Sequence, residues 1–74
     1  MENVNIVLAA NILKYRKKSG LSQDELAQKL GVTFQAVSKW ENAFAAPDIT
    51  VLPIMADIVG CYIDELFGRT VKTE

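Results

Sequence analysis

Histidine is absent from this sequence, and cysteine occurs only once, at Cys61. The missing histidines exclude catalytic triads that use an imidazole base and zinc sites built from cysteine and histidine. A single cysteine also excludes an internal disulfide framework. Cys61 is therefore expected to fill a core position as a small apolar side chain.

Long uninterrupted apolar runs are missing as well. The most apolar stretch, from Val4 to Leu13, is too short to span a membrane and is interrupted by Asn5 and Asn11. Glu2 stands in the region where a secretory signal would carry lysine or arginine. The sequence therefore predicts a cytoplasmic protein with no membrane segment.

Neither charge sign is in large excess, because the net charge at pH 7 is only −1. The distribution of charge is more informative than the total. Residues 14–39 contain six basic and two acidic side chains, a net charge of +4, whereas residues 48–66 contain four acidic and no basic ones, a net charge of −4. A domain polarised in this way can present a positive face to a polyanion. The alternative is that these are ordinary solvated charges.

Helical periodicity covers most of the 74 residues, a length that allows one small domain. Alternating β-branched stretches bounded by hairpin turns are missing, which argues against strands. Five helices are predicted. The first spans about Ile6 to Lys18 and ends at Gly20. Its predicted inner face consists of Ile6, Ala9, Ala10 and Leu13.

The second and third helices have strong boundary signals. Ser22 and Glu25 can form a capping box at the start of the second helix, and Gly31 ends it. Thr33 is the natural N-cap of the third helix, which continues to about Asn42. These two helices are therefore predicted with hardly any chain between them.

The fourth and fifth helices follow a loop over residues 43–47. Asp48 is expected to cap the fourth helix, and Gly60 to end it. Pro53 lies past the first turn of that helix, where it predicts either a late helix start or a mild kink. The fifth helix covers about Ile63 to Phe67.

The close spacing of the second and third helices requires a steep crossing, at about 90–120°. Such a crossing needs a small residue where the helices touch, which Ala27 provides. The turn needs a residue that tolerates positive φ, which Gly31 provides. Val37 and Trp40 can then lock the third helix into the core.

With these residues the sequence resembles the helix-turn-helix domain of the phage-repressor and Cro type, also called XRE-like. The resemblance lies in the stretches YRKKSGLSQDELAQKLGV, VSKWEN, PDI and DELFG. It implies an all-α fold, a compact five-helix lambda-repressor-like domain whose second and third helices form the helix-turn-helix. It divides the chain into an N-terminal extension of the first helix (1–11), the repressor-type domain (12–68, with the motif at 23–42) and a flexible tail (69–74).

The resemblance also implies binding to a double-stranded DNA operator, with the third helix in the major groove. Base readout is assigned to Thr33, Phe34, Gln35 and Ser38. Contacts with the DNA backbone are assigned to Gln23, Lys39 and Asn42. Gln35 can pair bidentately with adenine, and Phe34 can offer an apolar contact to a thymine methyl group.

Other roles for these residues are less specific. Arg16 and Glu41 match family positions that form an ion pair between the first helix and the end of the third, so their role is expected to be structural. Gln23 could be a simple helix-start residue, and Ser38 could be inert surface. Phe34 could be buried against a partner chain or a loop.

The sequence departs from the family pattern after the third helix. Many relatives have glycine where Ala43 stands, so a strained alanine or a different helix end is expected. The loop carries no lysine, arginine, serine or threonine and places Phe44 at its tip, which predicts a weak grip on the DNA backbone. Tyr62 replaces the usual small polar cap of the fifth helix.

The leading hypothesis is a sequence-specific transcriptional regulator, a repressor, that binds double-stranded DNA as a homodimer and needs no cofactor or metal. The fifth helix and the residues Val4, Val7 and Leu8 are the expected dimer surfaces. The alternative is a protein-interaction module or antitoxin-like adaptor with weak or lost DNA binding, whose partner contacts Phe34 and Phe44. An enzyme is the weakest hypothesis, because no nucleophile–base pair and no phosphate loop are present.

Overall fold

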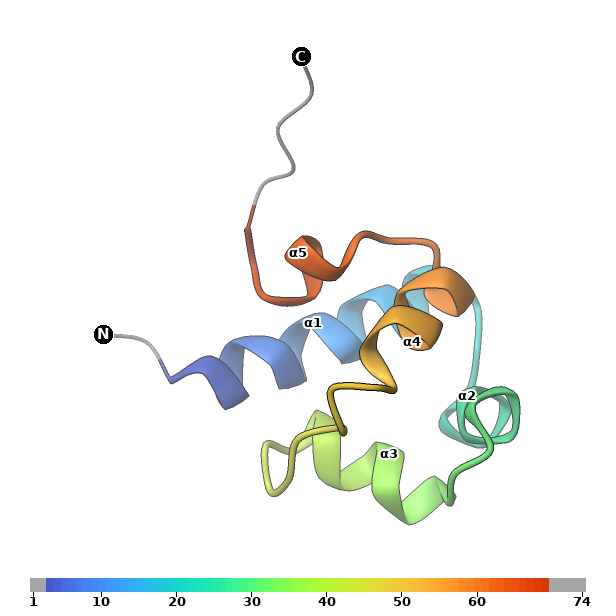
Figure 1. Ribbon diagram of the computed structural model, residues 1–74. Coiled ribbons are helices and arrows are strands. Elements are labelled where there is room, and N and C mark those ends of the chain that lie inside the picture. Colours follow the sequence, from blue (N-terminus) through green and yellow to red (C-terminus); the bar gives the residue numbers. More distant parts are fainter. Residues whose placement is uncertain (1–2, 70–74) are drawn as a thin grey trace.

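The computed structural model describes residues 3–69, and within this range the regular secondary structure is entirely helical. Its elements are α1 (Val4–Lys18), α2 (Gln23–Leu30), α3 (Phe34–Glu41), α4 (Leu52–Val59) and α5 (Ile63–Leu66). In Figure 1, α1 runs through the middle of the molecule, with α5 above it and α3 below it. The all-α, five-helix prediction is therefore confirmed. Apart from Arg69, the predicted flexible tail lies outside the described residues.

The helix α1 begins two residues earlier than predicted. The side-chain oxygen of Asn3 accepts a hydrogen bond of 2.8 Å from the backbone N–H of Asn5, which caps the helix at Val4. The residues Leu8, Ala9, Ile12 and Arg16 are buried along it. This stripe follows the i, i+4, i+8 spacing of a helix face.

The predicted inner face of α1 was therefore partly wrong. Ile6 and Ala10 are exposed and Leu13 is only partly buried, because the stripe through Leu8 turns them away from the core. The prediction that Leu8 belongs to a dimer surface is wrong for the same reason, since only 4% of Leu8 is exposed.

The predicted connection between α2 and α3 is present. The hydroxyl of Ser22 accepts a 3.0 Å hydrogen bond from the N–H of Glu25, whose carboxylate accepts a 2.9 Å bond from the N–H of Ser22. Gly31 ends α2 with a φ of 72°. Figure 1 views α2 nearly along its axis and α3 from the side, so the two helices cross steeply as predicted.

The turn after α3 contains the strained alanine that the sequence predicts. Ala43 has a φ of 61°, in the left-handed region that glycine usually occupies. This conformation lets the N–H of Phe44 donate a 2.9 Å hydrogen bond to the carbonyl of Lys39. The turn therefore satisfies a helix-end carbonyl in spite of the missing glycine.

The start of α4 corrects the predicted role of Asp48. The helix begins at Leu52, after Val51, and no side chain caps it. Asp48 instead caps the preceding turn, where its carboxylate accepts a 3.3 Å hydrogen bond from the N–H of Thr50. Pro53 explains the difference, because a proline lacks an N–H and is tolerated only in the first turn. Of the two outcomes predicted for Pro53, a late helix start or a mild kink, the structure shows the late start.

The core receives buried side chains from all five helices. Its largest fully buried side chains are Ile12, Leu26, Met55, Leu66 and Val37. Trp40 is buried as predicted. Cys61 is only half-buried, at the edge of this core, because it follows the left-handed Gly60 that ends α4. Burial raises the pKa of its thiol.

The helix α5 is held against α1 by side chains on both. The hydroxyl of Tyr15 donates a 3.3 Å hydrogen bond to Glu65, and Leu66 is fully buried. Glu65 also accepts a 2.9 Å hydrogen bond from the backbone N–H of Tyr62, so that the carboxylate satisfies this helix start without a small polar cap.

Candidate nucleic-acid interface

The helix α3 separates an inner face from an outer face. Val37 and Trp40 are buried in the core, while Phe34, Gln35 and Lys39 are exposed. The packing of the inner face fixes the rotation of the helix about its axis. The exposed residues at its N-terminal end are therefore held on a rigid element, as a recognition surface requires.

Thr33 can cap α3 and still donate a hydrogen bond. Its hydroxyl oxygen accepts a 3.2 Å hydrogen bond from the N–H of Ala36. Capping uses a lone pair of the oxygen, so the hydroxyl hydrogen stays available. The backbone N–H groups of Phe34 and Gln35 also have no acceptor within residues 3–69. The start of α3 thus offers several donors to an outside group.

The two residues after Thr33 differ in chemistry. The amide of Gln35 is exposed and makes no side-chain hydrogen bond to any described part of the chain. It keeps both its donor and its acceptor for a ligand. Phe34 is 44% exposed, so it is not buried against a loop of its own chain. Together they place a polar and an apolar contact side by side.

Ser38 and Asn42 interact mainly with each other. The side-chain amide of Asn42 donates a 2.8 Å hydrogen bond to the carbonyl of Ser38 and lies 3.5 Å from its hydroxyl. Both donors of this amide are therefore directed back at the helix. A phosphate offers only acceptors, so Asn42 could bind one only after this contact is released.

A buried ion pair joins α1 to the end of α3. The guanidinium of Arg16 contacts the carboxylate of Glu41 through Nε at 2.6 Å and through Nη2 at 3.0 Å, and both side chains are buried. The remaining Nη1 donates a 2.8 Å hydrogen bond to the carbonyl of Leu21. The pair expected from the sequence therefore forms, and it also holds the turn before α2.

Gln23 adds α2 to this network. Its side-chain nitrogen donates a 2.9 Å hydrogen bond to Oε1 of Glu41. The acceptor fixes which end of the amide faces inward, and the second N–H of the same nitrogen remains for another partner. The Arg16–Glu41 pair was predicted, but Glu41 was not predicted as the partner of Gln23, because the two residues are far apart along the chain.

The N-terminus of α2 combines attractive and repulsive groups for an anion. The backbone N–H groups of Gln23 and Asp24 carry no hydrogen bond within the described range, which favours an anion at this end. The first turn also carries the side chains of Asp24 and Glu25. The hydrogen bond from the Ser22 backbone lowers the pKa of Glu25, so its carboxylate stays charged at neutral pH. These charges oppose a phosphate at the same place.

Other kinds of site find no support in the part of the chain that the structure describes. No three histidine, cysteine, aspartate or glutamate side chains gather there so as to hold a metal ion. No helix between residues 3 and 69 has the length and apolar character needed to cross a membrane.

Two short, steeply crossed helices with a buried inner face and donors at both N-termini define a helix-turn-helix domain. A family model described as helix-turn-helix matches residues 12–66, and the chain belongs to this family. The resemblance to the phage-repressor and Cro type is thereby confirmed. The family and the relatives found are transcription regulators and not enzymes.

One similar protein is the SPbeta prophage-derived uncharacterized HTH-type transcriptional regulator YonR of Bacillus subtilis (strain 168), which is 37% identical over 57 residues. The match covers 77% of this chain and 53% of that protein, so the chain spans about half the length of this relative.

Two solved structures are also similar. A hypothetical transcription factor, NHTF, from Neisseria has a TM-score of 0.80 and 29% identity, over 88% of this chain and 75% of that one. The P22 c2 repressor protein, solved in complex with a synthetic operator, has a TM-score of 0.74 and 29% identity, over 80% of this chain and 89% of that one.

Proposed function

We propose that this chain is a sequence-specific DNA-binding domain that reads a double-stranded operator through the major groove with α3, and that it acts as a repressor. The observation that carries the proposal is the exposed N-terminal end of α3, where Thr33, Phe34 and Gln35 all keep free contacting groups. The similarity to a repressor solved with its operator supports the same reading.

Base readout would depend mainly on two neighbouring residues. The free amide of Gln35 can donate a hydrogen bond to N7 of adenine and accept one from its N6 amino group, which is the bidentate pairing expected for adenine. Phe34 would contact a thymine methyl group beside it. Thr33 and Ser38 would add hydroxyl contacts at the edges of this surface.

Contacts with the DNA backbone would come from residues around these two. Gln23 has one N–H left after binding Glu41, next to the free N–H groups of α2. Lys39 is exposed and can reach a phosphate. Asn42 would join only by giving up its hydrogen bond to Ser38. The acidic first turn of α2 implies modest affinity.

We infer that the working form is a homodimer on an operator whose half-sites lie about 34 Å apart, one turn of the double helix. A single α3 of eight residues contacts only a few base pairs. A second copy would double this contact. The cytoplasmic location expected from the sequence is part of the same proposal, since a repressor acts where the DNA is.

The test is selection of genomic DNA fragments, followed by titration of the selected site over a range of salt. Gln35→Ala should reduce discrimination against a mutated operator by about 1–3 kcal/mol. Lys39→Ala should weaken binding to all sequences and lower the salt slope by about 1. Gln28→Ala and Lys17→Ala, which change exposed residues outside α3, serve as matched controls. Absent or salt-independent binding would contradict the proposal.

A second candidate function is a protein-interaction module on the same scaffold. It is favoured by Phe44, which is 83% exposed at the tip of an uncharged loop, together with the exposed Phe34. A partner would bury both rings. Light scattering after size-exclusion chromatography with the captured partner separates the two functions, because Phe44→Ala should abolish that complex and leave DNA binding unchanged.

A further inference from the structure

A hydrogen bond at the end of α3 joins two of the residues that the sequence assigns to DNA contacts. The side-chain amide of Asn42 donates a 2.8 Å hydrogen bond to the carbonyl oxygen of Ser38, one helical turn earlier. A carbonyl oxygen only accepts, so the group of Asn42 beside it is the NH2 and not the amide oxygen. The partner therefore decides the orientation of this amide.

The same nitrogen determines how the hydroxyl of Ser38 is used. It lies 3.5 Å from Oγ of Ser38, so this oxygen faces a donor and accepts from it. The hydroxyl hydrogen must point elsewhere, and no acceptor among residues 3–69 takes it. The accepting capacity of Ser38 is thus engaged within α3, while its donor has no partner. The ligand group that complements such a hydroxyl is a hydrogen-bond acceptor.

We propose that Asn42 is a positioning residue, which makes Ser38 select thymine over cytosine at one position of the operator. The inference rests on the proposed function and deepens it. In the major groove, thymine presents the acceptor O4 where cytosine presents the N4 amino donor. The hydroxyl hydrogen of Ser38 bonds to O4 of thymine and meets a second donor on cytosine. Asn42 in this role acts through Ser38 and does not need to contact a phosphate.

Phe34 favours thymine over guanine as the source of this acceptor. Phe34, Ser38 and Asn42 follow one another at intervals of four residues, so they lie along one face of α3. The ring of Phe34 is 44% exposed and can contact a C5-methyl group. Guanine also presents an acceptor, O6, but has no methyl group. An apolar side chain and a free donor on one face match the two groups that thymine shows in the major groove.

The test replaces each thymine of the selected operator in turn by 5-methylcytosine, which keeps the methyl group and exchanges O4 for an amino group. Fluorescence anisotropy gives the ratio of the two dissociation constants for each protein. At one thymine, Ser38→Ala and Asn42→Ala should each lower the preference for thymine about three- to tenfold, the contribution of one hydrogen bond. The double variant should lower it no further. The paired purine also changes, but equally for every protein compared.

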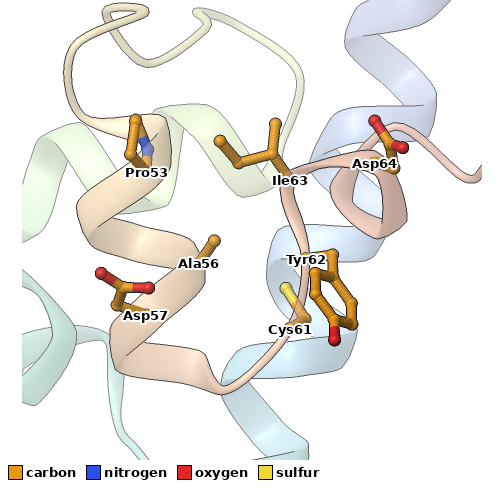
Figure 2. Close-up of a pocket in the computed structure, with 7 residues that line it drawn as sticks. All are labelled: Pro53, Ala56, Asp57, Cys61, Tyr62, Ile63 and Asp64. Carbon is orange, nitrogen blue, oxygen red and sulfur yellow. The ribbon is translucent and has the colours of Figure 1, made fainter. Parts of the chain in front are cut away.

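Asn42→Asp gives the sharpest comparison. A carboxylate only accepts, so the hydroxyl of Ser38 turns its hydrogen toward it and leaves its lone pairs to the DNA. The preference should therefore move from thymine toward 5-methylcytosine. Asp57→Asn is the matched control, since it makes the reverse exchange at an exposed residue of α4. Asp57 borders the hollow of about 410 Å³ between α4 and α5 (Figure 2), and its replacement should leave the ratio unchanged.

Partial unfolding of a variant cannot imitate the expected result, because it weakens binding to both sites equally and leaves their ratio unchanged. The inference is overturned if Ser38→Ala or Asn42→Ala keeps the wild-type ratio at every thymine of the operator. In that case the proposed function stands, provided that the wild type still distinguishes the operator from unrelated DNA. A wild type that binds all sequences alike overturns the proposed function and the role of Asn42 together.

Discussion

At the residue scale, Glu41 connects three helices around the proposed interface. Its carboxylate binds the guanidinium of Arg16 on α1 and the amide of Gln23 on α2, while its own backbone belongs to α3. One buried carboxylate thus fixes three helices relative to one another. Removing a partner from a buried pair costs more than the pair itself contributes, because the remaining charge is left uncompensated.

Glu41→Gln should therefore lower the free energy of unfolding by about 3–5 kcal/mol, measured by urea denaturation followed by circular dichroism. In a domain of this size such a loss can exceed the total stability. The double variant Arg16→Met with Glu41→Leu should recover most of the loss, because it leaves no buried charge. A double variant no more stable than Glu41→Gln would show that the charge is not the cause.

Ala43 gives a second prediction at this scale. Its φ of 61° is costly for any residue with a Cβ atom, so Ala43→Gly should stabilise the protein by about 1 kcal/mol and raise the melting temperature by about 4–8 °C. Ala45→Gly, in the same loop but not at positive φ, should leave the melting temperature unchanged or lower it. Differential scanning calorimetry of the two variants makes the comparison.

At the scale of elements, the boundaries of α2 and the start of α3 were predicted well, and the inner face of α1 and the start of α4 less well. The limits of α2 and the start of α3 depend on residues within one turn, such as Ser22, Glu25 and Thr33, so the sequence contains the information locally. The inner face of α1 and the start of α4 depend on distant partners and on Pro53. The sequence alone therefore misplaced Ile6 and the role of Asp48.

The capping box of α2 leads to a prediction about pH. Hydrogen bonds from Ser22 lower the pKa of Glu25 below its ordinary value of 4.5. A carboxylate with a lowered pKa contributes stability above its unfolded-state pKa and loses it as the pH falls through the folded-state value. The difference in unfolding free energy between the wild type and Glu25→Gln should be largest near neutral pH and shrink on acidification below pH 4.5. A difference that grows in acid would contradict the role of the box.

At the scale of the whole molecule, the position of a charge should affect DNA affinity more than the net charge does. Most of the basic residues precede α4, while α4 and α5 carry acidic residues. The candidate site was predicted through the resemblance, and the structure places its residues Gln35 and Lys39 on α3. The inward direction of the Asn42 amide was not predictable, because it depends on the rotamer chosen beside Ser38.

Two variants with the same change in net charge test this point. Asp24→Asn removes a carboxylate beside the free N–H groups of α2 and should raise DNA affinity severalfold at low salt, with the difference shrinking near 1 M, where the screening length is about 3 Å. Asp57→Asn, on α4, should leave affinity almost unchanged. Fluorescence anisotropy with labelled operator DNA measures both, and equal gains would mean that only the total charge counts.

The uninterrupted course of α1 has a geometric consequence. Val4, one of the residues that the sequence predicts for the dimer surface, and Arg16, in the ion pair with Glu41 of α3, stand on one continuous helix. Twelve residues of helix span about 18 Å. In the proposed homodimer, the length of this helix would set the distance between each α3 and the two-fold axis. Lengthening or kinking it would change the operator spacing that the dimer accepts, even with every DNA-contacting side chain left intact.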